Sequence, residues 1–160
     1  MGERVWSVEE SLVIAAPAAE VYAAVADPRR MVEWSTELFA VRVRGQRFTG
    51  FNRKGPLVWF TSCRIAVAEP DAEFAFDVTS FGLPIARWGY RVEAEPAQGG
   101  TRITEYWLDH RRTPGWRRTV AELLGLVFTA TPAARRAEVN RRGMRVTLQR
   151  ISESLTGQPA

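Results

Sequence analysis

Glu105 is the ionisable residue whose position in this sequence most strongly suggests chemistry. It alternates with Ile103 and Trp107 in the stretch ITEYW, so in a β-strand it shares a face with two apolar side chains. A carboxylate on an apolar wall is costly unless it is paired or protonated. We expect either a raised pKa, with Glu105 acting as hydrogen-bond donor or general base toward a ligand, or a buried structural pair with Arg64 or Arg87.

Several polar residues fall on predicted inward faces of other elements and could meet Glu105. They are Asn52, Thr61, Asn140 and Thr147. Asn52 lies between two glycines, where its amide could either bind a ligand oxygen or stabilise a turn. Tyr90 or His110 would complete an acid–base pair with Glu105. His110 is the only histidine and follows a predicted strand, where exposure to solvent is the plainer interpretation.

Other kinds of functional site are not indicated. A single histidine cannot build a metal centre, and the carboxylates lack ligand-like spacing. The net charge is +4, and the basic residues, nearly all arginine, are spread along the chain with acids between them. Nucleic-acid recognition usually needs a clustered basic face and a recognisable module. We therefore expect no metal, no cofactor and no nucleic-acid partner.

The elements that must position these residues begin with a strand over residues 5–14. Pro17 and the pair Asp27-Pro28 are typical helix starts, which predicts one short helix over residues 18–26 and a second that carries Met31, Val32 and Trp34. Alternating apolar residues and turn signals then predict six strands, joined as hairpins. These lie at 38–44, around 48–52, and at 58–68, 74–78, 85–95 and 101–109. Helices follow from Pro114, and the last, over 133–155, has an apolar stripe that includes Met144.

Four segments in this order resemble the START-like, polyketide cyclase/dehydrase superfamily. They are IAAPAAEVYAAVADPRRMVEW, FTGFNRKGPLVWFTSCRIAVAEP, ARWGYRVEAEPAQGGTRITEYW and NRRGMRVTLQRI. The resemblance implies an α+β helix-grip fold: a curved seven-stranded antiparallel sheet, two short helices after strand 1 and a long C-terminal helix. It implies one domain over residues 1–156 and a frayed tail over 157–160. Members bind lipids, hormones or polyketides, or catalyse ring closure, so the fold alone does not choose a function.

A curved sheet wrapped around a helix leaves a gap, and such gaps are often apolar cavities of roughly 300–1,000 Å³. We expect this one to be lined by aromatic and polar residues from the sheet, the short helices and the last helix, with Trp34 and Phe39 near its mouth. The predicted ligand-binding residues are Trp34, Phe39, Asn52, Trp59, Thr61, Phe76, Trp88, Tyr90, Trp107, Asn140, Met144 and Thr147. The alternative is that the rings simply fill the core.

The segment VAELLGLVF, residues 120–128, is unusually apolar for a helix before the main one. It could close the cavity, form a homodimer, or touch an anionic membrane surface together with Arg117 and Arg118. The plain alternative is packing against its own domain.

Three functions follow from these features. The first is binding of a small hydrophobic molecule, lipid-like or polyketide-like. The second is an aromatase/cyclase that folds a poly-β-ketone chain and eliminates water, with Glu105 as the catalytic residue. The third is a protein-interaction module that uses helix 120–128. The single cysteine, Cys63, is expected to be a buried apolar residue. The lack of a signal peptide or membrane span predicts a cytoplasmic location, and we expect a bacterial protein.

Overall fold

The computed structural model describes residues 5–111, 115–129 and 133–158. β1 (Ser7–Ile14) is followed by α1 (Ala18–Val25), a 3-10 turn (Pro28–Arg30) and α2 (Met31–Trp34). The next strands are β2 (Leu38–Arg44), β3 (Arg47–Lys54), β4 (Leu57–Glu69), β5 (Glu73–Ser80), β6 (Leu83–Glu95) and β7 (Gly100–Asp109). A 3-10 turn (Pro96–Gln98) joins β6 to β7, and α3 (Trp116–Thr129) and α4 (Ala133–Thr156) complete the described elements.

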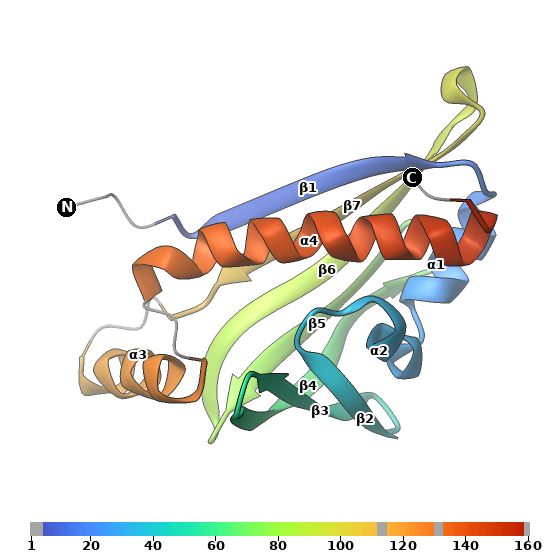
Figure 1. Cartoon of the computed structure of the whole chain (residues 1–160). Helices are drawn as coiled ribbons and strands as arrows, with labels where there is room; N and C mark the ends of the chain where they lie inside the picture. Colours follow the sequence, from blue (N-terminus) through green and yellow to red (C-terminus); the bar gives the residue numbers. More distant parts are fainter. Residues whose placement is uncertain (1–4, 112–114, 130–132, 159–160) are drawn as a thin grey trace.

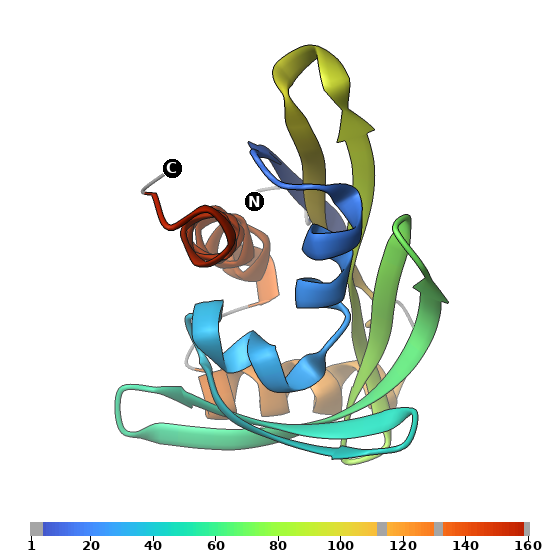
Figure 2. The same ribbon diagram turned by 90° about the vertical axis from the view of Figure 1, so that its right-hand side faces the viewer.

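All seven strands form one antiparallel sheet in the order β1-β7-β6-β5-β4-β3-β2. Its register shifts at three places, between Leu38 and Ala40, Ile65 and Val67, and Val78 and Thr79. Such bulges bend a strand and increase its twist. The sheet therefore curves around α4, which runs across its concave side while α1, α2 and α3 lie on that same side (Figures 1 and 2). This confirms the predicted helix-grip fold.

The short helices between β1 and β2 follow from local chemistry. The Asp27 carboxylate accepts a hydrogen bond from the Arg29 backbone N–H at 3.0 Å, and Pro28 occupies the first helical position, where no N–H is needed. Only glycine fits at position 100, because a Cβ there would lie 2.1 Å from the Ile14 carbonyl oxygen. The backbone at the end of β1 can therefore pass close to Gly100 where the chain turns toward α1.

Alternation along the strands divides the sheet into an inner and an outer face, as predicted. In β4, Cys63 is buried on the inner face while Val58 and Phe60 are exposed on the outer one. The fully buried core lies between the sheet, α1, α2 and α4, and includes Trp34, Phe74, Ile14, Ile103, Met144 and Ile151. The strand starts agree with prediction to within two residues, and the largest differences are at β1, which begins at residue 7, and at β6, which begins at residue 83.

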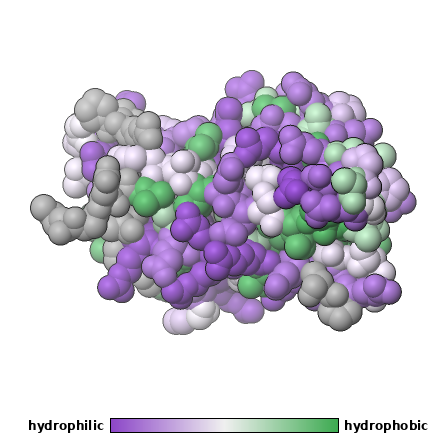
Figure 3. Space-filling model, turned by 90° about the horizontal axis from the view of Figure 1, so that it is seen from above, coloured by the Kyte–Doolittle hydropathy of each residue, from purple (hydrophilic) through white to green (hydrophobic). Residues whose placement is uncertain are grey.

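The surface over α4 is largely hydrophilic, with small apolar areas (Figure 3). On that side Glu10 of β1 pairs with Arg141 and Arg145 of α4, at 3.4 and 3.2 Å. Among the described residues, no helix is long and apolar enough to cross a bilayer.

Candidate functional site

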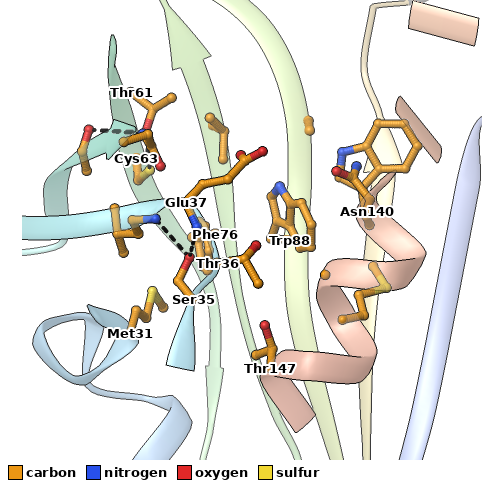
Figure 4. Close-up of a pocket in the computed structure, with 18 of the residues that line it drawn as sticks. Met31, Ser35, Thr36, Glu37, Thr61, Cys63, Phe76, Trp88, Asn140 and Thr147 are labelled. Atoms are coloured by element: carbon orange, nitrogen blue, oxygen red, sulfur yellow. Dashed lines mark hydrogen bonds between the residues drawn. The ribbon is translucent and has the colours of Figure 1, made fainter. Parts of the chain in front are cut away.

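A cavity of about 220 Å³ lies between the concave sheet, α4 and the segment from α2 to the start of β2. Figure 4 shows its walls: Thr61 and Cys63 come from β4, Trp88 from β6, and Asn140 and Thr147 from α4. The volume is below the expected range because Trp59, Trp88 and Trp107 all occupy the lining. A small molecule of one or two rings is the size of guest that this space can hold.

The structure brings nearly all of the predicted site residues to this one cavity. Its lining contains Trp34, Asn52, Trp59, Thr61, Phe76, Trp88, Tyr90, Glu105, Trp107, Asn140, Met144 and Thr147. Phe39 is the exception and that assignment was wrong: the bulge at the start of β2 turns it outward, where it is half exposed beneath the Arg53 guanidinium. Trp34 is fully buried rather than at the mouth.

Glu105 lies on the inner face of β7 and is only 4% exposed. Its cross-strand neighbours are Tyr90 on β6 and Glu10 on β1. The Tyr90 hydroxyl donates a hydrogen bond to Glu105 Oε1 at 3.3 Å. Burial raises the pKa of Glu105 to about 8, while the Tyr90 hydrogen bond lowers it. The carboxyl group is therefore protonated at neutral pH. Neither Arg64 nor Arg87 forms the expected ion pair with it, and Arg87 instead binds Asp77 at 2.8 Å.

Three buried polar atoms of the lining have no hydrogen-bond partner among the described residues. They are Trp34 Nε1, Glu105 Oε2 and Asn140 Nδ2. Burial raises the pKa of Tyr90 well above its usual value, and the Trp34 indole beside the tyrosine hydroxyl only partly offsets this. No hydrogen bond of ordinary geometry forms between Trp34 Nε1 and that hydroxyl. With Glu105 protonated, all three atoms are hydrogen-bond donors. Buried donors are costly to leave unpaired, so the cavity favours a guest that brings acceptor oxygens.

Two arginines also line the cavity, each held by a carboxylate. Arg111 binds Asp109 through two contacts of 2.8 Å, and both side chains are buried. Arg136 on α4 binds Glu37 at 2.9 Å, which joins α4 to the segment that precedes β2. Because each positive charge is balanced by its own partner, the lining carries little net charge and suits a neutral guest.

These charged residues and the stretch from Ser35 to Glu37 were not predicted as site residues from the sequence. Asp109 continues the inward alternation of Ile103, Glu105 and Trp107, and this phase could have revealed it. Arg111 lies beyond the strand and Glu37 lies in an irregular segment. No periodicity governs such positions, so the sequence holds no signal for them.

Cys63 provides a test of how closed the cavity is. Burial raises the pKa of its thiol from 9.0 to about 12, and the Thr61 hydroxyl beside it only partly offsets this. At neutral pH we expect alkylation by iodoacetamide roughly a thousandfold slower than for a free cysteine, because the thiolate is the reactive form. Mass spectrometry over time would measure the rate, with urea-unfolded protein as control. Alkylation of the folded chain at the unfolded rate would contradict this description.

The apolar helix predicted at 120–128 is part of α3, which contacts β4, β6 and α4. Trp116, Leu123 and Leu126 are exposed on it, and Val120 is at the margin of exposure. The side chains of Leu124, Val127 and Phe128 lie outside the described residues. Homodimer formation or membrane contact through this helix stays a prediction.

Comparisons with known proteins identify the family. The family model for polyketide cyclase/dehydrase and lipid transport matches residues 5–151. The polyketide-cyclase-like protein Cgl2372 of Corynebacterium glutamicum is 31% identical, with a TM-score of 0.60 over 97% of this chain and 93% of that one. No curated protein matches the chain in sequence.

Two further solved structures share the fold at lower identity. The protein DR_A0006 of Deinococcus radiodurans is 18% identical, with a TM-score of 0.57 over 84% of this chain and 98% of that one. The di-domain aromatase/cyclase BexL of the BE-7585A biosynthetic pathway is 17% identical, with a TM-score of 0.67 over 96% of this chain and 51% of that one. With its family model matched along nearly the whole length, the chain belongs to the polyketide cyclase/dehydrase and lipid transport family.

Proposed function

We propose that the protein binds a small, neutral, hydrophobic molecule, such as a ketone or quinone, with at least one oxygen that accepts hydrogen bonds inside the cavity. The observation that carries this proposal is the set of three unpartnered donors, Trp34 Nε1, Glu105 Oε2 and Asn140 Nδ2, in the lining of a mostly apolar cavity. A guest oxygen would relieve the cost of leaving these atoms unpaired. The tryptophan rings would supply most of the apolar contact.

The selectivity of this site for an oxygen is its most testable property. A site whose polar groups hydrogen-bond a ligand oxygen discriminates strongly against an analogue that lacks this oxygen. An apolar site discriminates only weakly against a ligand with an additional oxygen. We expect 1-tetralone to bind about tenfold to a hundredfold more tightly than tetralin, which has the same ring system without the carbonyl. Isothermal titration calorimetry with both compounds would measure the ratio.

Asn140→Leu is the matched variant for this test. The substitution keeps the approximate side-chain size and removes an unpartnered buried donor, so the protein should fold at least as stably as the wild type. The preference for tetralone should fall by about tenfold, while tetralin affinity stays the same or rises. Equal affinity of the wild-type protein for the two compounds would refute the proposal.

A second candidate function is cyclisation of a poly-β-ketone. Glu105 supports it, because a carboxyl group with a pKa of about 8 and a free oxygen facing a cavity can give a proton to a carbonyl oxygen. In such an aldol step the enol carbon bonds to the carbonyl carbon, and the carbonyl oxygen takes the Glu105 proton and becomes a hydroxyl group. The enol becomes a ketone and gives its hydroxyl proton to the Glu105 carboxylate, which restores the acid. The new hydroxyl group then leaves as water together with a proton from the neighbouring carbon. Loss of product with Glu105→Gln, while ketone binding is retained, would favour the enzyme over the binding protein.

A further inference from the structure

The hairpin region of β2, β3 and β4 has a strongly unbalanced charge. The segment from residue 38 to residue 68 contains six basic residues and no aspartate or glutamate. They are Arg42, Arg44, Arg47, Arg53, Lys54 and Arg64. The remainder of the chain holds all 18 acidic residues and the other 16 basic ones. The positive net charge of the protein is therefore concentrated on these three strands.

Strand register places three of these arginines in one row. Arg44 lies opposite Arg47, and Arg47 lies opposite Arg64. Directly opposed residues project to the same face, where like charges destabilise the pairing. Arg64 is next to Asp77, but that carboxylate is bound by Arg87 at 2.8 Å. Arg44 and Arg47 form no ion pair with any residue that the structure describes, so an external anion would stabilise this row.

An apolar row lies four residues further along the same outer face. Phe51 is opposite Phe60, and the Phe60 ring contacts the Phe81 ring edge to face, with centroids 5.6 Å apart. Phe60 is 44% exposed, Phe81 61% and the nearby Val58 55%. Large side chains that gather on a surface, rather than lying singly, mark an interaction site.

Phe81 is held in this row at the expense of backbone strain. It occupies the left-handed region, with φ +49°, in the turn between β5 and β6. This conformation favours glycine and asparagine and is costly for a bulky side chain. A strained aromatic residue that remains largely exposed suggests a role outside the folding of the chain.

We propose that the outer face of β2, β3 and β4 docks the protein onto an anionic lipid bilayer. The phenylalanines would enter the interfacial region, and the arginine row would contact lipid phosphates. A bilayer satisfies both rows at once, whereas a soluble anion would leave the aromatic row exposed. The inner faces of the same strands line the cavity through Asn52, Thr61 and Cys63. Only the thickness of the β-sheet would then separate the cavity from the membrane. Figure 2 shows that the helices lie on the other side of these strands, away from the proposed membrane-facing surface.

Vesicle sedimentation at low ionic strength tests this proposal. The wild-type chain should bind phosphatidylcholine vesicles that contain phosphatidylglycerol, and should not bind pure phosphatidylcholine. Arg44→Gln/Arg47→Gln should lower the partition coefficient roughly tenfold to thirtyfold, since each interfacial arginine contributes to binding. Arg29→Gln/Arg142→Gln is the matched control: it removes the same charge from exposed positions elsewhere, so it should retain most of the binding.

Phe81→Asn separates a docking role from a structural one. Asparagine tolerates the left-handed turn, so the melting temperature should not fall, while the vesicle partition coefficient should fall about fivefold or more. The proposal is overturned if the wild type ignores anionic vesicles, or if the control loses as much binding as the arginine-row variant. It is also overturned if single-stranded RNA displaces the vesicles, or if the same substitutions instead abolish a dimer formed without lipid.

Discussion

Replacing Glu105 with glutamine will remove a pH-dependent loss of stability between pH 4.5 and about 8. Below pH 4.5 the carboxyl group is protonated in both the folded and the unfolded chain. Above it the unfolded chain loses the proton, while the folded chain keeps it until the raised pKa of about 8. The folded state therefore binds more protons across this window, and stability falls as pH rises, by up to about 1.4 kcal/mol per pH unit.

The full effect across this window is about 4–5 kcal/mol, a large share of the stability of a typical domain. Urea unfolding at pH 5, pH 6.5 and pH 8 would measure it in the wild type and in Glu105→Gln, and the difference between their slopes isolates this group. Glu10, the other carboxylate beside Glu105 in the strand register, keeps its partners Arg141 and Arg145 in both proteins. Exposed Glu93 offers a control substitution that should leave the slope unchanged. Parallel slopes in wild type and Glu105→Gln would show that the carboxyl ionises normally.

Gly143→Phe will abolish ligand binding without unfolding the protein. Gly143 lies within α4 and lines the cavity, and a Cβ there would meet only the Thr36 hydroxyl, at an ordinary contact distance of 3.5 Å. A phenyl ring added at this position occupies the space that a guest needs. We expect tetralone affinity to fall by more than about fiftyfold, which corresponds to roughly 2–3 kcal/mol.

Gly143→Ala is the control for this substitution. Glycine within a helix costs roughly 0.5–1 kcal/mol relative to alanine, so the alanine variant should be more stable than the wild type by about that amount. Its single methyl group leaves most of the cavity open, and binding should persist. Calorimetric titration and thermal unfolding of both variants would measure these effects. A folded phenylalanine variant with wild-type affinity would place the guest elsewhere.

Much of the fold could be predicted because most stretches of the strands alternate regularly between apolar and polar residues. The alternation of Trp59, Thr61 and Cys63 fixed the inner face of β4, and that of Ile103, Glu105 and Trp107 fixed the inner face of β7. The long strands carry these patterns over many residues, so several positions of one strand agree on which face is the inner one. The same alternation placed Glu105 inside the protein, where its pKa is raised.

Prediction failed where the backbone departs from regular geometry. Phe39 has the same parity as Val41 and Val43, which face inward, so regular alternation would place it inside. The register shift between Leu38 and Ala40 reverses that phase, and Leu38 faces inward in its place. The sequence offered both Tyr90 and His110 as partners of Glu105 and could not choose between them, because pairing Tyr90 with Glu105 depends on the exact register of β6 and β7. A shift of one residue would move a side chain to the other face. Alternation gives the face of a residue, but not its neighbour on the next strand.

The measurement that tests the central claim most directly is native mass spectrometry of the protein purified from its own source cells, with Gly143→Phe in parallel. The cavity and its three unpartnered donors predict a bound molecule in the wild type that is released on denaturation, contains oxygen and carries no charge. The phenylalanine variant should be free of it. A wild-type protein without any bound molecule, or equal occupancy in both proteins, would contradict the account.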